Sequence, residues 1–518
     1  MKMKHHFVKI ITLCMLIPTL AFFACNTTSS WPLLLSLLFT LHLSLHAWLI
    51  PGGYAWRSHR SSAATPPIPG PVGWPLLGSI PIMGPLAHQN LARLSAALSA
   101  SRLMALSLGP TRLVIASHPD TAREILCGLG FSDRPMKASA RLLMFERAIG
   151  FAPSGEYWRR LRRVAASGLF SPRSIMGLGP IREKVANDMC MRVGREREVV
   201  VREVFQEGAL NNMMGSLFGE WLGLHGRGEL VGMVREGYEL IGKFNWEDYF
   251  GVGGWLDFHG VGRRCKGLAS RVKCLVGGII QERRRKGEFG GDDFLGVLFR
   301  LPEEERLTDD DMIAVLWEMI FRGTDAIAIL LEWAMARMVL HPEIQSKAQQ
   351  EIDANVGRAR PIQDLDIPNL PYVQAILKEV LRMHPPGPLL SWARLAAHDV
   401  QVGKHLVPAG TVAMVNMWAI AHDKSIWTDP WAFKPKRFVE EEVSVMGSDL
   451  RLAPFGAGRR VCPGRAMGLA TAHLWFARLL QEFDWGPARP VVLSERLRLS
   501  MEMKVPLVCR AVRRLSVE

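Results

Sequence analysis

The chain has 518 residues, of which 48% are hydrophobic and 22% charged, and its formal net charge is +14. This composition indicates a globular protein with a large core and excludes a disordered chain. No basic stripe interleaved with aromatic residues and no zinc-finger spacing occurs, so the positive charge points to an anionic membrane surface or an acidic protein partner, not to nucleic acid. The eight cysteines form no CxxC pair, which favours a reducing compartment over a disulfide scaffold.

The first 60 residues predict a membrane anchor. Apolar segments lie at 10–25 and 31–50, and the second contains no Asp, Glu, Lys or Arg. Twenty helical residues span a bilayer core of about 30 Å. The first segment is shorter and contains Pro18, so whether one segment or both cross the membrane stays open. Arg57 and Arg60 follow the second segment and place the rest of the chain on the cytoplasmic side.

A proline-rich strip at 61–80 predicts a stiff, extended hinge between the anchor and a body at 81–518. Helical periodicity dominates this body and short strands interrupt it, so the expected class is mainly α with small β-sheets. Segments 131–150 and 205–262 are candidates for contact with a substrate. We expect helices at 85–100, 119–128, 155–168, 181–196, 228–243, 260–286, 308–341, 343–356, 371–383 and 464–482, and strands at 103–109, 112–117, 399–403 and 411–417.

A lone cysteine lies in the glycine-rich stretch "PFGAGRRVCPGRAMG", residues 454–468. The glycines allow tight turns that point backbone amides at the sulfur of Cys462, and a helix starting near Gly464 would stabilise a thiolate. Arg460 could reach a ligand carboxylate on the other side. Such a thiolate suits axial binding to haem iron, whereas the competing interpretation is a buried structural cysteine.

This loop resembles the haem loop of the cytochrome P450 family, F-x-x-G-x-R-x-C-x-G, at all of its fixed positions: Phe455, Gly458, Arg460, Cys462 and Gly464. The resemblance implies that Cys462 is the axial ligand of the iron of haem b. It also implies that Phe455, Arg460 and Gly464 contact the cofactor.

Further motifs carry the same resemblance. Glu379 and Arg382 match the E-x-x-R pair, whose spacing places both side chains on one helix face, and Arg437 supplies a second guanidinium. The resemblance implies that these three residues are structural and brace the haem loop. It also implies that Trp158 and Arg162, in a W-x-x-x-R pattern, and Arg394 bind the haem propionates.

The finer resemblance is to plant A-type members, in particular the seventy-eight-A subfamily. It implies the helical triangular prism of the cytochrome P450 fold and a monooxygenase that inserts one atom of O₂ into a lipophilic, fatty-acid-like substrate. Electrons would come from NADPH through NADPH–cytochrome P450 reductase, whose acidic face would suit Arg459, Arg460 and Arg465. The resemblance also implies contact with membrane lipid, an endoplasmic reticulum membrane location facing the cytosol, and a role in organ or seed growth.

The stretch "RGTDA", residues 322–326, interrupts an otherwise apolar helix with a glycine and charged side chains, which costs helix stability. It resembles the [AG]-G-x-D-[TS] signature of the helix that crosses the haem. The resemblance implies that Gly323 leaves room for O₂ and that Thr324 and Asp325 take part in proton delivery. From spacing alone, Glu318, Arg322 and Asp325 could form an ion ladder on one helix face.

Ala326 departs from the signature, because most members carry a threonine whose hydroxyl holds a water for proton delivery. Thr324 does not replace it, since residues two apart face different sides of a helix. A water or a substrate hydroxyl could carry the proton instead. The alternatives are poor coupling with peroxide release, an oxygen-independent haem-thiolate isomerase or dehydratase, or a non-catalytic membrane haem sensor.

Overall fold

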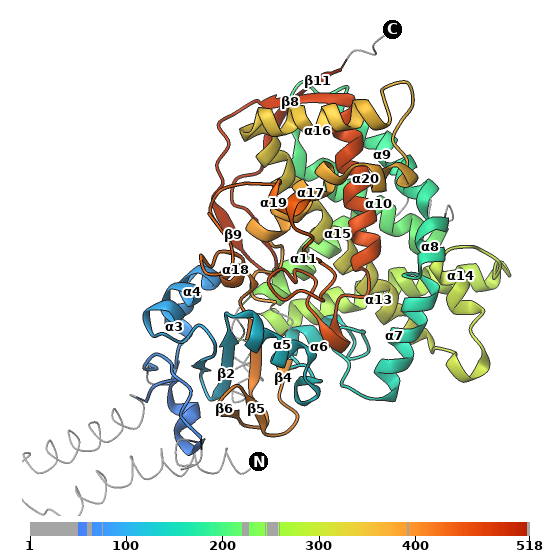
Figure 1. The fold of residues 1–518 in the computed structure, drawn as a ribbon. Helices are drawn as coiled ribbons and strands as arrows, with labels where there is room; N and C mark the ends of the chain where they lie inside the picture. The colour runs from blue at the N-terminus through green and yellow to red at the C-terminus, as the bar shows by residue number, and fades with distance from the viewer. Residues whose placement is uncertain are drawn as a thin grey trace, which may run out of the picture.

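The computed structural model describes residues 50–59, 65–74, 76–219, 227–243, 245, 257, 260–390 and 393–514 (Figure 1). Helices form most of the body, and a four-stranded sheet lies at one corner beside the first helices. The expected class, mainly α with small sheets, is confirmed. The predicted segment 10–25 and all but the last residue of 31–50 lie outside the described part, within which no helix has the length and hydropathy of a membrane span.

The ten predicted helices are present, and their ends differ from the prediction by at most three residues. The structure adds α3, α6, α8, α10, α14, α18 and α19 to them. The described α-helices are α3 (Ile80–Met83), α4 (Ala87–Ala97), α5 (Pro119–Cys127), α6 (Ala138–Leu143), α7 (Glu156–Gly168), α8 (Pro172–Gly177), α9 (Gly179–Val193), α10 (Val201–Phe218), α11 (Arg227–Gly242), α13 (Val261–Arg285), α14 (Phe294–Phe299), α15 (Asp309–Leu340), α16 (Pro342–Asn355), α17 (Pro371–Met383), α18 (Met417–Ala421), α19 (Arg437–Glu440) and α20 (Arg465–Glu482).

The strands form small sheets. The largest has the order β1-β2-β7-β4, in which β2 and β7 run parallel, and a three-stranded sheet has the order β3-β11-β8. Two hairpins pair β5 with β6 and β9 with β10. The strands are β1 (Met104–Leu108), β2 (Thr111–Ala116), β3 (Val199–Val200), β4 (Arg394–Leu395), β5 (Val400–Val402), β6 (His405–Val407), β7 (Val412–Val415), β8 (Phe483–Pro487), β9 (Glu495–Leu497), β10 (Met501–Met503) and β11 (Val508–Arg513).

The described part of the proline-rich strip lies against the sheet. The Ala105 amide of β1 donates to the Pro69 carbonyl at 2.8 Å, and the Gly52 amide donates to the Pro71 carbonyl at 2.7 Å. Prolines cannot donate to a ladder, so they are tolerated at a sheet edge, where their carbonyls still accept. These bonds join the described part of the strip to Gly52 on one side and to β1 on the other.

Helix α15 is the central element and most of its residues are buried. Its start carries a capping box, because Thr308 accepts from the Asp311 amide while the Asp311 side chain accepts from the Thr308 amide. The Asp311 carboxylate also pairs with Arg147 at 2.6 Å. These bonds fix one end of the helix against the segment before α7.

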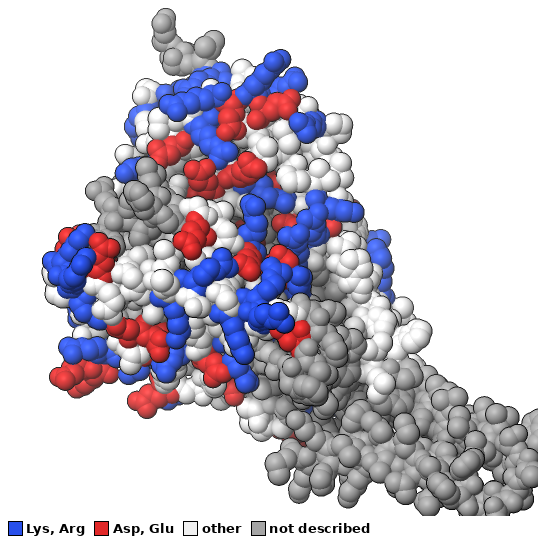
Figure 2. All heavy atoms as spheres, turned by 180° about the vertical axis from the view of Figure 1, so that it is seen from behind, with Lys and Arg blue, Asp and Glu red and all other residues white. Residues whose placement is uncertain are grey.

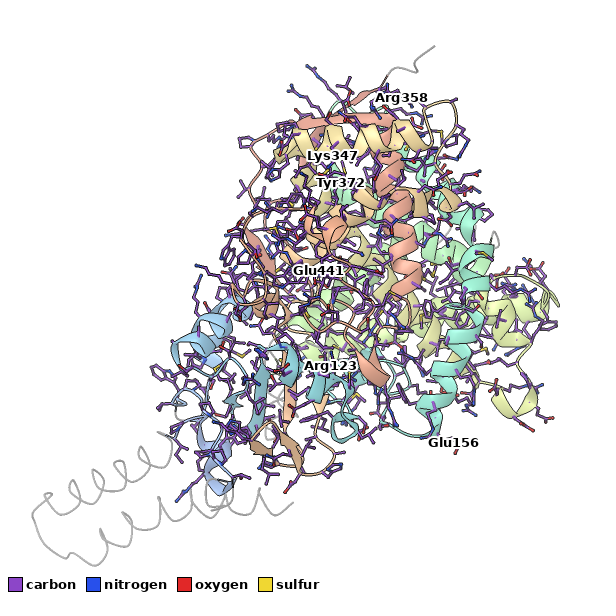
Figure 3. All side chains as sticks on the ribbon, viewed as in Figure 1. Arg123, Glu156, Lys347, Arg358, Tyr372 and Glu441 are labelled. Carbon is purple, nitrogen blue, oxygen red and sulfur yellow. The ribbon has the colours of Figure 1, made fainter. Side chains whose placement is uncertain are left out.

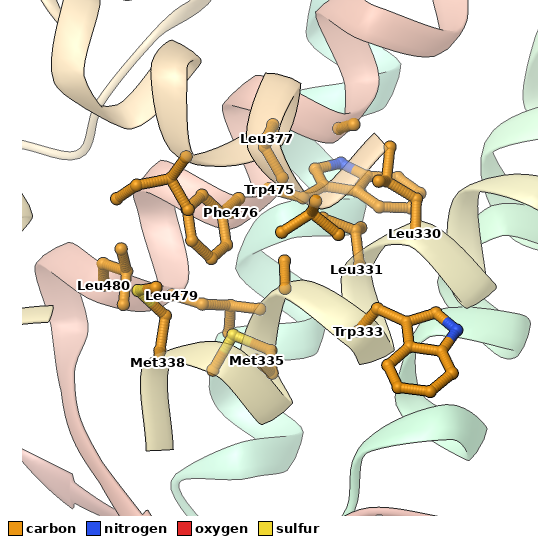
Figure 4. Close-up of a cluster of buried hydrophobic side chains, with 14 of the residues drawn as sticks. Leu330, Leu331, Trp333, Met335, Met338, Leu377, Trp475, Phe476, Leu479 and Leu480 are labelled. Atoms are coloured by element: carbon orange, nitrogen blue, oxygen red, sulfur yellow. The ribbon is translucent and has the colours of Figure 1, made fainter. Parts of the chain in front are cut away.

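The main core lies between α15, α17 and α20. Figure 4 shows Leu330 and Leu331 of α15 facing Leu377 of α17 and Trp475 of α20, all of them buried. Burying apolar area at this density contributes the largest share of folding free energy. The core holds α15 in place relative to α20, whose N-terminus follows the cysteine loop.

Charged residues cover the outside. On the face seen in Figure 2, Lys and Arg side chains are interspersed with Asp and Glu. Surface contacts include the ion pair of Arg284 with Asp309 at 2.8 Å and the stacking of Lys347 of α16 over the Tyr372 ring of α17 at 4.3 Å (Figure 3). Exposed pairs of this kind stabilise a fold only slightly.

Candidate active site

A cavity of about 300 Å³ lies between α15 and the loop that precedes α20. Cys462 lines it, and much of the wall is apolar. Both predicted substrate-facing segments reach the cavity, with Arg134, Ile149 and Gly150 from 131–150, and with Asn212, Met213 and Tyr238 from 205–262. The apolar wall includes Ile327, Leu330, Leu381, Leu390 and Val415.

The cysteine loop is held by its own backbone. The Cys462 amide donates to the Phe455 carbonyl at 3.0 Å, and the Gly464 amide hydrogen-bonds the Cys462 side chain. Gly458 has φ +67°, and a β-carbon there would lie 2.3 Å from the Leu126 carbonyl oxygen. Only glycine fits this conformation and this close approach to the end of α5.

Burial raises the pKa of the Cys462 thiol, while the Gly464 amide and the nearby guanidinium groups of Arg322, Arg162 and Arg465 lower it. A thiolate in this position therefore has positive neighbours but little water. Ligation to a metal would supply the missing stabilisation, because a coordinating thiol loses its proton.

Four arginine side chains line the cavity beside this loop, namely Arg134, Arg162, Arg394 and Arg460. They bind carbonyl oxygens, with Arg162 donating to Val461 at 2.5 Å, Arg394 to Ala457 at 2.9 Å, Arg460 to Ser132 at 3.0 Å and Arg134 to Ala393 at 3.2 Å. The nearest carboxylate to Arg460 is Asp133, at 3.9 Å.

This arginine cluster carries more positive charge than its surroundings neutralise. Burial, and then the neighbouring arginines, lower the pKa of Arg134 well below its usual value. Burial lowers the pKa of Arg394 and of Arg460 to about 10. Nε of Arg134 and Nη2 of Arg460 are buried and have no hydrogen-bond partner among the described residues. Buried donors and cations of this kind call for an anionic ligand.

Trp158 lies behind the arginine cluster and is not among the residues that line the cavity. Its indole N–H donates to the Ile149 carbonyl at 3.1 Å, and its ring stacks against the Arg460 guanidinium at 4.1 Å from the ring centroid. The tryptophan therefore positions Arg460 in this structure.

The structure brings Glu379, Arg382 and Arg437 together. Arg382 makes two bonds of 2.8 Å to the Glu379 carboxylate, and Arg437 approaches the same carboxylate at 3.2 Å. Arg382 also donates to the carbonyls of Ala421 and Pro430. Glu379 and Arg382 are fully buried and away from the cavity lining, which fits a structural role.

At the interruption of α15, Gly323 packs against α10. A β-carbon on Gly323 would lie 2.1 Å from Cε of Met213, so the space beside this glycine is occupied by the methionine methyl group. Of the expected ion ladder, the pair between Glu318 and Arg322 forms, with 3.2 Å between the Arg322 Nε and a Glu318 carboxylate oxygen. The Glu318 carboxylate also accepts from the Gly150 amide at 2.8 Å.

Thr324 and Asp325 point away from the cavity lining. The Thr324 hydroxyl donates to the Ile320 carbonyl and is buried. The Asp325 carboxylate accepts a hydrogen bond from Gln206 of α10. Burial, reinforced by the negative charge of Glu502, raises the pKa of Asp325 to about 6.

Asp325 borders an ion network that joins α10, α15 and the β9–β10 hairpin. Arg202 bridges the Glu332 carboxylate at 2.8 Å and the Glu502 carboxylate at 3.4 Å. Glu332 is fully buried, whereas the side chain of Glu502 is 13% exposed. The network therefore leads from Asp325 towards the surface.

Comparison with known proteins gives the family. The model of the family "Cytochrome P450" matches residues 68–506. Cytochrome P450 78A5 of Arabidopsis thaliana is 53% identical over 489 residues, covering 90% of this chain and 92% of the relative. The chain belongs to the cytochrome P450 family. It is therefore an oxidoreductase of the haem-thiolate monooxygenase class, whose members carry haem b and usually take electrons from NADPH through a reductase.

Other relatives agree. Cytochrome P450 78A3 of Glycine max is 48% identical over 496 residues, covering 93% of this chain and 94% of the relative. Among solved structures, a zebra fish cytochrome P450 with progesterone superposes with a TM-score of 0.72 at 26% identity, covering 82% of this chain and 99% of that one. The expected cytochrome P450 fold is thereby confirmed.

The residues of this cytochrome P450 fit haem b. The cavity presents one cysteine sulfur to an iron and four arginines to two propionates, and two of those arginines have buried donor atoms without partners. Arg134 was missed by motif matching, because it lies in no haem signature. Its only sequence signal is its place in the segment 131–150.

One expectation about the surface is wrong. Arg460 is 6% exposed and faces the cavity, so it cannot belong to a basic docking face together with Arg459 and Arg465. Arg465 is half-buried and donates to the Cys462 carbonyl at 3.1 Å, which leaves Arg459 as the exposed member of the three. The reason is that a 3₁₀ turn at Gly458–Arg460 points the two consecutive arginines in different directions.

Proposed function

We propose that this cytochrome P450 is anchored in the endoplasmic reticulum membrane and hydroxylates a lipophilic, fatty-acid-like substrate with O₂. In this proposal Cys462 would bind the iron of haem b through its sulfur, and the bound haem would supply the oxygen chemistry. The observation that carries the proposal is the position of Cys462 in an amide-lined loop that opens into a largely apolar cavity beside unneutralised arginines.

The chain's own residues bind and orient. Arg134, Arg162, Arg394 and Arg460 neutralise the two propionates, and the Gly464 amide stabilises the negative charge on sulfur. The wall around Ile327 and Leu330 excludes water and takes the hydrocarbon part of a substrate.

Asp325 and its neighbours supply protons to the site in this proposal. A carboxyl group with a pKa of about 6 both holds and releases a proton near neutral pH, and it adjoins the Arg202–Glu502 pair that reaches the surface. Gly323 and Thr324 hold this turn of α15 against α10 and against the preceding turn. Ala326 faces the cavity without a hydroxyl, so the last proton step requires a water or a substrate group.

The electrons come from NADPH through a membrane reductase. Exposed Arg459 of this chain contacts the acidic face of that reductase. The apolar segments 10–25 and 31–50 form the anchor in this proposal. Trp74, which is 60% exposed, with exposed Val72 and Leu76 near it, supports contact of the body with membrane lipid. The proposal includes a role in organ or seed growth, which the resemblance to the seventy-eight-A subfamily implies.

The test is spectroscopic. Microsomes containing the chain should give the red-shifted band of a thiolate-bound haem after reduction and addition of carbon monoxide, and Cys462→Ser should abolish that band. Its absence from the wild type would refute the proposal. Product formed per NADPH consumed, with reductase present, then measures monooxygenation.

An oxygen-independent isomerase or dehydratase is the second candidate. It is favoured by one observation, namely that neither Ala326 nor the Thr324 hydroxyl, which is bonded to Ile320, offers a hydroxyl to the cavity. Product formation without NADPH and without O₂ would establish it.

A further inference from the structure

The segment 149–151, shortly before α7, forms part of the cavity wall and is held residue by residue. Its first residue, Ile149, is buried and lines the cavity. The Ile149 carbonyl accepts from the indole N–H of Trp158 at 3.1 Å and from Arg460 at 3.4 Å. The segment is therefore fixed at this end by the arginine cluster and by the tryptophan that positions it.

Helix α15 holds the other two residues of the segment. The Gly150 amide donates to the Glu318 carboxylate at 2.8 Å, and Gly150 also lines the cavity. The guanidinium of Arg322, which pairs with that carboxylate, lies 5.6 Å from the centroid of the Phe151 ring. A β-carbon on Gly150 would lie 2.6 Å from both Cζ of Arg322 and Oε1 of Glu318. Only a residue without a β-carbon allows the segment to approach the ion pair so closely.

The Glu318 side chain is only 3% exposed. Taking a carboxylate out of water is unfavourable unless an opposite charge and hydrogen-bond donors compensate it. Arg322 supplies the charge and the Gly150 amide supplies a hydrogen bond, so the carboxylate is stabilised partly by the segment that it holds. Glu318 is therefore a clamp between α15 and the segment 149–151.

A second fixed group borders the same part of α15. Met213 of α10, which lines the cavity, fills the space beside Gly323, where a β-carbon would lie 3.3 Å from the methionine sulfur. The clamped segment 149–151 and Met213 thus narrow the cavity at this turn. The apolar wall at Ile327 and Leu330 begins one turn further along the helix. A fixed border of this kind excludes wide ligands by steric contact while a slender chain still fits.

We propose that Glu318 is a positioning residue that determines substrate specificity. Its bond to Gly150 holds the segment 149–151 against α15, so that the site takes a slender, unbranched chain and excludes fused-ring compounds. This inference rests on the proposed function and deepens it, because it names the contact that selects a fatty-acid-like substrate. Glu318 acts through the segment and does not touch the reacting atoms.

The test is a set of binding titrations of the haem-loaded enzyme, followed by the change in haem absorbance on ligand binding. The probes are dodecanoic acid, which is a slender chain, and progesterone, which is a rigid fused-ring compound. Neither reductase nor NADPH is added, so the titration measures binding separately from catalysis. The wild type should bind dodecanoic acid more tightly than progesterone by at least about tenfold in Kd.

Two variants open the clamp by different routes. Glu318→Leu removes the acceptor of the Gly150 amide and should reduce the preference for dodecanoic acid about tenfold, which corresponds to the loss of one hydrogen bond to a charged group. Gly150→Ala keeps the Glu318–Arg322 pair but pushes the segment away from it, and it should reduce the preference in the same direction. The second variant serves if Glu318→Leu does not retain haem.

Two controls keep the clamp. Glu318→Gln retains a side-chain oxygen that can accept from the Gly150 amide, so it should keep the wild-type preference. Gly155→Ala is the matched control for Gly150→Ala. Gly155 has extended backbone, does not line the cavity, and a β-carbon there would meet no described atom within 4 Å apart from its chain neighbours. This variant should also keep the preference.

An unchanged preference in both Glu318→Leu and Gly150→Ala would overturn the proposal. So would equal affinity of the wild type for the two probes, or a loss of preference in Glu318→Gln or Gly155→Ala as large as in the clamp variants. Failure of the proposed function would look different, because the reduced carbon monoxide complex would then lack its thiolate band whatever ligand is added.

Discussion

Replacing Asp325 by asparagine should stabilise the protein above neutral pH. The carboxyl is buried beside Glu502 and Glu332, and its pKa is raised from 3.8 to about 6. One pH unit corresponds to about 1.4 kcal/mol, so ionised Asp325 costs at most about 3 kcal/mol relative to the unfolded chain. Asparagine keeps the size and a hydrogen bond to Gln206 without that cost.

The sign follows from the raised pKa. The folded state binds the proton more tightly than the unfolded state, so the contribution of Asp325 to stability is complete below pH 3.8 and is lost as the pH rises to about 6. The difference between Asp325→Asn and wild type should therefore grow over this window and level off above it. Taking the difference cancels the titration of groups that do not interact with Asp325. Glu332, whose pKa is also raised, is coupled to Asp325, so the difference reports the change in both groups.

The assay is urea unfolding followed by tryptophan fluorescence, in steps from about pH 5 to about pH 8, with the midpoint compared between variant and wild type. Asp309→Asn is the matched control of opposite sign, because the hydrogen bond from Arg284 lowers the pKa of Asp309. That control should lose stability near neutral pH. A midpoint difference for Asp325→Asn that does not change with pH would refute the reasoning.

Three further predictions concern the site. Gly458→Ala should reduce haem retention on gel filtration more than Gly456→Ala does. Both glycines have positive φ, but only at Gly458 would the new methyl group meet a carbonyl oxygen, at 2.3 Å. Equal losses of haem from the two variants would contradict the steric argument. Glu379→Gln should destabilise the fold by about 3–5 kcal/mol because Arg382 would be buried without its countercharge, which the urea midpoint measures, and a loss below about 1 kcal/mol would contradict it. Ala326→Thr should raise, or leave unchanged, the fraction of NADPH that ends in product; a large loss of activity would show that the cavity needs the small residue.

Much of the fold was predictable from local pattern. Helix ends at α15 and α17 follow from a capping box and from Pro371, whose effects extend over only a few residues. The cysteine loop and the Glu379–Arg382 spacing are equally local, so they could be recognised and placed on a loop and on a helix without the fold.

Helix α10 could not be predicted in the same way. Twelve of its residues are buried, on nearly all sides, so it has no continuous polar face and no clear helical period. The consequence reaches the site, because α10 supplies Asn212, Met213 and Gln206. Their partners on α15 are about a hundred residues away in the chain, a separation at which sequence spacing carries no information.

The sequence by itself determined the family, the cysteine at the centre of the site and the class of reaction, because these depend on short motifs with fixed spacing. Tertiary structure alone decided which groups face the cavity. It brought Arg134 beside Arg460, turned Thr324 and Asp325 away from the lining and filled the space at Gly323 with Met213. The physical reason is that a side chain's direction and burial depend on packing between distant segments, whereas a motif records only neighbours along the chain.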